Sequence, residues 1–189
     1  MYLYDNNLTK LVVANCPKIE LISCANNSLN DVSFLSALDP RKLTNLYLEN
    51  NNIWEHNLSC FERFTNLTTL WIGNSDESKI SQGIYNRFIG SLKFLKNLTR
   101  LESLSISNTD IDSGLEYLPS AVKEFRCSAD QRAGSRVKKI EEELKPFLTS
   151  KFYGTYDFSG WKNEKAKNEL SNLRVQIEKK KATTSTNRN

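Results

Sequence analysis

Residues 43–53 read Leu-Thr-Asn-Leu-Tyr-Leu-Glu-Asn-Asn-Asn-Ile and place apolar side chains at fixed distances around an asparagine. Leu46 and Leu48 alternate with polar neighbours, as residues on one face of a short β-strand do. Asn51 follows three residues later and Ile53 restores an apolar position. The stretch therefore predicts a strand with two inward-facing residues, followed by a turn at Asn51.

The same spacing recurs along the chain. The apolar residues at the position of Leu48 are Leu3, Cys24, Leu48, Ile72, Ile106 and Cys127. Successive members lie 21, 24, 24, 34 and 21 residues apart, which indicates one repeated structural unit of roughly 20–29 residues. The residues expected at the asparagine position are Asn6, Asn27, Asn51, Ser75, Thr109 and Asp130. Stacked units of this kind would bury their apolar residues in one continuous core, in about six coils.

This pattern resembles the leucine-rich-repeat family over residues 1–130. The phrases at 15–19, 24–29, 115–119 and 125–130 are similar to the expanded sets of some fungi, in which a helical or coiled-coil tail often follows the repeats. The resemblance implies an α/β solenoid with a curved parallel sheet, and a protein-interaction module without catalysis. It also implies that each asparagine amide satisfies backbone groups of adjacent coils. These hydrogen bonds between coils should weaken toward the C-terminus, where Ser75, Thr109 and Asp130 replace asparagine.

The 34-residue step contains an insertion. Between Ile80 and Lys96, apolar residues recur at helical spacing, so we expect a helix in this return segment. They are Ile84, Phe88, Leu92 and Leu95. A second apolar set (Leu58, Phe61 and Phe64) predicts a shorter helix in the preceding unit.

The character of the chain changes near residue 130. Residues 1–130 carry 12 basic and 15 acidic side chains, whereas residues 131–189 carry 14 basic and 7 acidic ones. After the solenoid we expect a C-terminal capping helix over 131–149, with Val137, Ile140 and Leu144 on one face. An aromatic linker and a short coiled-coil-like helix would cover 150–181, followed by a disordered tail over 182–189. The seam of the tail helix predicts weak self-association, packing on its own solenoid, or the first part of a longer coiled coil.

The exposed side of the sheet is the expected binding site. Tyr47 and Trp71 fall on adjacent strands at outward positions, next to Glu49. Tryptophan and tyrosine are typical of interface hot spots, but cross-strand stacking worth roughly 0.2–1 kcal/mol explains them equally well. The candidate partner-binding residues are Tyr47, Trp71, Glu49, Asn45, Thr69, Ser105 and Arg126. Gly73 is expected to leave room beside the indole.

Several chemistries are not expected. His56 is the only histidine, and the four cysteines follow no paired metal-binding pattern, so we expect no catalysis, no metal and no cofactor. Cys24 and Cys127 fall at core positions. The sequence has no apolar run long enough to cross a membrane and no secretory signal at its start, which predicts an intracellular, cytoplasmic protein.

The expected partner is a protein or peptide, with no small-molecule substrate and no membrane. Two alternatives assign the chain to a larger protein, as the substrate receptor of a ubiquitin ligase or as the sensor of a signalling protein. Nucleic-acid binding through residues 162–181 is the weakest reading, because that basic segment lacks interleaved aromatic residues and runs of charge are usually solvated.

Overall fold

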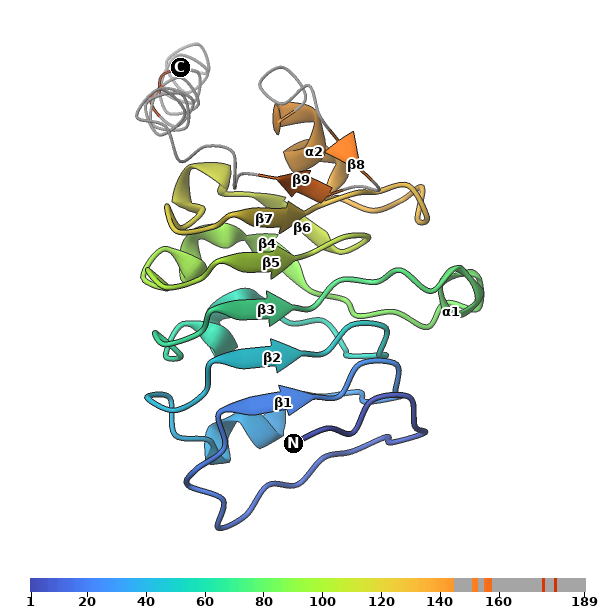
Figure 1. Ribbon diagram of the computed structural model, residues 1–189. Coiled ribbons are helices and arrows are strands. Elements are labelled where there is room, and N and C mark those ends of the chain that lie inside the picture. Colours follow the sequence, from blue (N-terminus) through green and yellow to red (C-terminus); the bar gives the residue numbers. More distant parts are fainter. Residues whose placement is uncertain (145–150, 153–154, 158–174, 176–178, 180–189) are drawn as a thin grey trace, which may run out of the picture.

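Five short parallel strands form the central sheet of the computed structural model (Figure 1), which describes residues 1–144, 151–152, 155–157, 175 and 179. They are β1 (Leu21–Ser23), β2 (Asn45–Tyr47), β3 (Thr69–Trp71), β5 (Ser103–Ser105) and β7 (Glu124–Arg126). Their middle residues pair in one register across the sheet: Ile22, Leu46, Leu70, Leu104 and Phe125. The expected α/β class with a parallel sheet is confirmed.

Both edges of the sheet carry additional pairing. Tyr2 forms a parallel bridge with Ser23 beside β1. At the opposite edge, β9 (Thr155–Asp157) pairs antiparallel with β7, and β8 (Lys151–Phe152) pairs antiparallel with β9. The last strand in the parallel set is therefore not an open edge.

The segments that return from each strand to the next lie on the other side of the molecule. They contain the 3-10 helices η1 (Ser33–Ala37), η2 (Leu58–Phe61), η3 (Leu92–Leu95) and η4 (Leu115–Tyr117). They also contain a second, two-stranded parallel sheet of β4 (Ile89–Ser91) and β6 (Asp110–Ser113). The α-helices are α1 (Glu77–Ser81), which stands out from the body in Figure 1, and α2 (Lys138–Leu144) beside the last strands.

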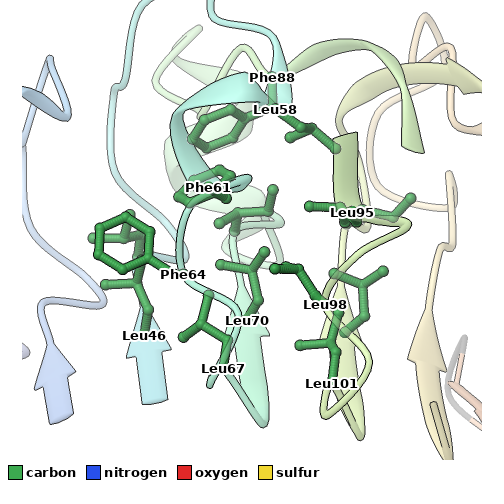
Figure 2. Packing of buried hydrophobic residues seen from close by; sticks show 14 of the residues in the cluster. Leu46, Leu58, Phe61, Phe64, Leu67, Leu70, Phe88, Leu95, Leu98 and Leu101 are labelled. Carbon is green, nitrogen blue, oxygen red and sulfur yellow. The ribbon is translucent and has the colours of Figure 1, made fainter. Parts of the chain in front are cut away.

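The hydrophobic core fills the space between the sheet and the return segments. Figure 2 shows Leu46 and Leu70 from the strands together with Phe61 from η2 and Leu95 from η3, and all four side chains are fully buried. Burying each such side chain contributes about 1.5–3 kcal/mol. Cys24 and Cys127 are buried in the same cluster, as the sequence predicted. Burial raises the pKa of the Cys24 thiol to about 11, so it stays protonated at neutral pH.

The prediction of a helix between Ile80 and Lys96 is wrong. Helix α1 ends at Ser81, and beyond it only Leu92–Leu95 is helical, as the 3-10 helix η3; residues 86–91 directly before η3 are extended. The extended chain pairs with a neighbouring segment, because the N–H of Arg87 donates to Ile53 and the N–H of Ile89 donates to His56. Pairing with distant residues thus overrides the helical spacing of the apolar side chains. The shorter predicted helix is present as η2, over Leu58–Phe61.

A row of buried asparagine side chains joins successive turns of the chain near the strand ends. Here a turn means one strand together with the segment that follows it. The Asn51 amide group donates to the carbonyls of Cys24 and Leu48, each at 2.9 Å, and its oxygen accepts from the N–H of Leu29. Asn27 makes the equivalent contacts one turn earlier, with Leu3, Cys24 and Leu8. Each amide therefore bonds to at least three backbone groups.

Ser75 does not hold the next position in this row, contrary to expectation. Asn86 holds it, with its amide donating to the carbonyls of Leu48 and Ile72 and accepting from the N–H of Ile53. Residues 75–85, including α1, are inserted ahead of it, and Ser75 itself is exposed. Two hydrogen bonds close the base of the inserted loop. The N–H of Asn86 donates to Asn74 Oδ1 at 2.7 Å, and Asn74 Nδ2 donates to the Asn86 carbonyl at 3.2 Å.

A second polar row lies one residue earlier in four of the turns. Asp5, Asn26, Asn50 and Asn108 all adopt left-handed backbone conformations, with φ of 55–56°. Asn50 Nδ2 donates to Asn26 Oδ1 at 2.7 Å, and Asn26 Nδ2 donates to Asp5 Oδ1 at the same distance. Asparagine and aspartate tolerate this conformation better than other side chains, which explains their presence at these four positions.

The helix expected over 131–149 starts later than predicted, at Lys138. α2 begins there because the preceding backbone N–H groups already donate to side chains: those of Gln131 and Arg132 to Asn108, and that of Arg136 to Asp110. The three residues expected on its apolar face (Val137, Ile140 and Leu144) are fully buried.

Most of the tail predictions lie outside the described residues, among them the end of the capping helix at 145–149, the seam of the coiled-coil-like helix and the tail over 182–189. Within the described part of the chain, no helix is long and apolar enough to cross a membrane.

Candidate partner-binding site

Two aromatic side chains occupy the middle of the outward sheet face. Tyr47 on β2 and Trp71 on β3 are paired residues of adjacent strands, and both are partly exposed. Their ring centroids lie 5.2 Å apart with an angle of 86° between the planes, so the edge of one ring meets the face of the other. The sequence placed these two rings side by side, and the geometry agrees.

Trp71 is fixed from a second direction by groups of the following strands. Its indole Nε1 donates to Ser103 Oγ at 2.8 Å, and Ser103 Oγ donates to Glu124 Oε2 at 2.7 Å. The guanidinium of Arg126 donates twice to Glu124 Oε1 and lies 4.4 Å from the centre of a Trp71 ring. These contacts hold the indole in one orientation on the sheet surface.

A small polar hollow of about 230 Å³ lies beside the aromatic pair. Glu49 and Gly73 contribute from the chain that continues β2 and β3, and Ser105 and Arg126 contribute from β5 and β7. Asp130 also lines it. Three of the predicted residues (Glu49, Ser105 and Arg126) therefore share one cavity, although they are far apart in the sequence.

Glu49 has an unusual environment within this hollow. Its Oε2 atom is buried and has no hydrogen-bond partner among the described residues. Burial raises the pKa of the Glu49 carboxyl to about 7, while a hydrogen bond from its own backbone and the charge of Arg126 offset part of this rise. The side chain is thus poised between its neutral and ionised forms at neutral pH.

Gly73 allows two chain segments to approach each other closely. A Cβ atom on this residue would lie 2.6 Å from the backbone nitrogen of Ser107 and 2.9 Å from its carbonyl oxygen. The space beside Gly73 is therefore filled in part by backbone, whereas the sequence suggested open room beside the indole. The absence of a side chain here is required by packing.

The remaining predicted residues lie around the pair. Asn45 and Thr69 occupy the strand positions before it, where Asn45 Nδ2 donates to Thr69 Oγ1 at 3.0 Å. Ser105 is buried and contributes to the hollow rather than to the open surface. Sequence reasoning left out Ser103 and Glu124, which position Trp71 and Arg126. Their outward strand positions were the available signal.

A second and more apolar groove of about 550 Å³ lies between η1 and η2, away from the predicted site. His56 and Cys60 line it. Burial raises the pKa of the Cys60 thiol to about 12, so it is protonated and a poor nucleophile at neutral pH. Among the residues that the structure describes, no three His, Cys, Asp or Glu side chains are grouped so that they could hold a metal ion.

Comparison of the chain with protein-family models and with curated proteins finds no match to either.

Proposed function

We propose that this chain is a leucine-rich-repeat solenoid that binds a protein or peptide on the outward face of β2, β3, β5 and β7. Two features support the solenoid. The paired residues of β1, β2 and β3 are 24 residues apart, so equivalent sequence positions face one another. The buried amides of Asn27, Asn51 and Asn86 join successive turns in the same way.

The binding role rests above all on the immobilised Trp71. Side chains that are already ordered before binding lose little conformational entropy when a partner covers them. Trp71 is partly exposed and is held by Tyr47, Ser103 and Arg126. A rigid tryptophan with a tyrosine neighbour has the composition and placement of an interface hot spot.

The adjacent hollow favours a peptide or protein over a small-molecule substrate. Its volume of about 230 Å³ is below the roughly 300–1,000 Å³ of typical ligand pockets. It suits one side chain of a larger partner, with the aromatic pair supporting the neighbouring part of that partner.

The test compares captured proteins for the wild-type chain and for a Tyr47→Ala/Trp71→Ala double variant. Proteins that the wild type captures from native lysate are identified by mass spectrometry, and one of them is then purified and its Kd measured directly. We expect the double variant to weaken that Kd by at least about 100-fold, because hot-spot residues each contribute about 2 kcal/mol or more. Circular dichroism verifies that the variant is folded.

The matched control is Trp54→Ala/Tyr117→Ala. These two side chains are 61% and 41% exposed but lie in return segments, outside the sheet. The control should leave the Kd within about twofold, since it removes exposed aromatic area of the same kind elsewhere. Equal binding by the folded sheet variant and the wild type would contradict a binding role for this face.

A further inference from the structure

The carboxylate of Glu49 lacks a counter-charge of its own. The guanidinium of Arg126 is the nearest candidate, but it donates two hydrogen bonds to Glu124 and stacks on Trp71. Glu49 Oε2 is buried and has no hydrogen-bond donor among the described residues. Buried polar atoms in folded proteins almost always have a partner, so an unsatisfied acceptor on a residue that lines a cavity indicates a missing donor.

We propose that the hollow receives a cationic side chain of the bound partner, from lysine or arginine, with Glu49 as its counter-ion. This inference rests on the proposed function and names the chemistry that the face recognises. Both side chains carry only donors at their charged end, which match the unsatisfied carboxylate oxygen.

The charges and surfaces around the hollow agree with a cation. Glu49 and Asp130 line it with negative charge, and the positive charge of Arg126 is already paired with Glu124. Tyr47 and Trp71 end β2 and β3, two residues before Glu49 and Gly73. Lysine and arginine lay their aliphatic stems along such surfaces and place the charged end beyond them.

The size of the hollow and the hydroxyl groups in its wall fit one charged group. Ser105 and Ser107 line the cavity next to Glu49 and offer further acceptors for the N–H groups that the carboxylate does not take. A neutral donor would leave the charge of the Glu49 carboxylate unbalanced, and an anionic side chain would be repelled.

The experiment uses the full chain, immobilised, and four pools of acetylated and amidated heptapeptides. The pools carry lysine, arginine, acetyl-lysine or norleucine at the central position and the same residue mixture elsewhere. We expect the wild type at pH 8 to retain the lysine or the arginine pool at least about tenfold better than the acetyl-lysine pool, since a charge-assisted hydrogen bond carries this much selectivity. Glu49→Gln, which keeps the shape and removes the charge, should abolish the preference.

Dependence on pH gives a second readout. A carboxyl with a pKa of about 7 is roughly one-tenth ionised at pH 6 and nine-tenths ionised at pH 8, so retention of the cationic pool by the wild type should rise about tenfold over this range. Arg126 and Asp130 are the other charged groups that line the hollow. Glu49→Gln should show no such rise.

Three results would overturn the cation site. Equal retention of the lysine, arginine and acetyl-lysine pools, lost in Tyr47→Ala/Trp71→Ala, would leave the binding face standing without a cation pocket. An undiminished preference in folded Glu49→Gln would place the counter-ion elsewhere. Retention of no pool would also reject the site, while the capture experiment would still decide on the binding face itself.

Discussion

The N-terminal turns and the last turns satisfy their buried backbone groups with different side chains. At Asn27, Asn51 and Asn86, one buried side chain donates to two or three backbone carbonyls and accepts from one N–H. At the corresponding place near the C-terminal end, Thr109 Oγ1 donates only to the Ile106 carbonyl. Ser135, from the segment before α2, donates to the Thr109 carbonyl instead.

The difference shows that the asparagine row stabilises one part of the molecule and the C-terminal segment stabilises the other. Arg132 strengthens the second arrangement. Its side chain forms an ion pair with Asp110 at 2.6 Å, donates to the Asn108 carbonyl, and lies over the Tyr85 ring. Substitutions in the first part should therefore act through one side chain, and those in the second through contacts with residues 131–144.

Asn51→Ala should have the largest effect. It removes three hydrogen bonds and leaves the buried N–H of Leu29 without a partner, while the two carbonyls each keep one donor from a neighbouring asparagine, so we expect the free energy of unfolding to fall by about 3 kcal/mol. Urea unfolding measures the change. The control Asn7→Ala removes an exposed amide and should stay within about 0.5 kcal/mol. A loss below about 1 kcal/mol at Asn51 would show that the row does not hold the turns together.

Arg132→Met should follow, with a loss of about 2 kcal/mol, because it leaves Asp110 unpaired in a largely buried setting. The two side chains of this ion pair are 12% and 17% exposed. The matched variant Lys123→Met removes an ion pair with Glu102 in which both side chains are 50% exposed, and it should change stability by less than about 0.5 kcal/mol. Equal losses in the two variants would argue against a special role for the C-terminal segment.

Glu49→Gln should increase stability by about 1–2 kcal/mol at pH 8 and have little effect near pH 4. Burial raises the folded-state pKa of Glu49 to about 7, above its unfolded value, so the folded chain holds a proton that the unfolded chain releases between pH 4.5 and 7. The wild type therefore loses stability as pH rises through this window, and the variant lacks that loss. Thermal unfolding at pH 4, 6 and 8 measures the difference. Parallel pH profiles of the two proteins would contradict a raised pKa.

Thr109→Val should have the smallest effect, about 1 kcal/mol or less, because it removes a single hydrogen bond at nearly constant volume. Urea unfolding beside Asn51→Ala tests the contrast directly. A loss as large as that of Asn51→Ala would mean that the last turns depend on their polar side chain as strongly as the first ones do.

Much of the parallel sheet could be predicted, because residues that are buried on one face of each strand must recur at each pass of the chain. Leu46, Leu70 and Leu104 are such residues, and they pair in register. The pairing of Tyr47 with Trp71 followed from the same register. The extended chain over residues 86–91 was not predictable from spacing, since its conformation is set by hydrogen bonds to distant residues such as Ile53 and Asp110.

The residues that line the hollow beside Trp71 were predicted only in part. Glu49 and Arg126 were recognised from their outward positions, but their shared cavity depends on how the turns after β3 and β5 approach each other at Gly73. Local sequence does not specify such an approach. The unsatisfied oxygen of Glu49 is a property of three-dimensional packing and has no counterpart in the spacing of residues.

The closed base of the inserted loop makes residues 75–85 a site for loop grafting. Asn74 and Asn86 are joined by two hydrogen bonds, and Trp71 still pairs with Ser105 across 34 residues of chain. Closing a loop costs only about 0.6 kcal/mol of additional free energy for each doubling of its length. A longer foreign segment placed here therefore lowers the stability of the fold only slightly. Its main cost is the loss of Lys79, which anchors the native loop to the carbonyls of Asn27 and Asn50. An epitope or a second binding loop inserted at this point would project from the side of the sheet face without interrupting it.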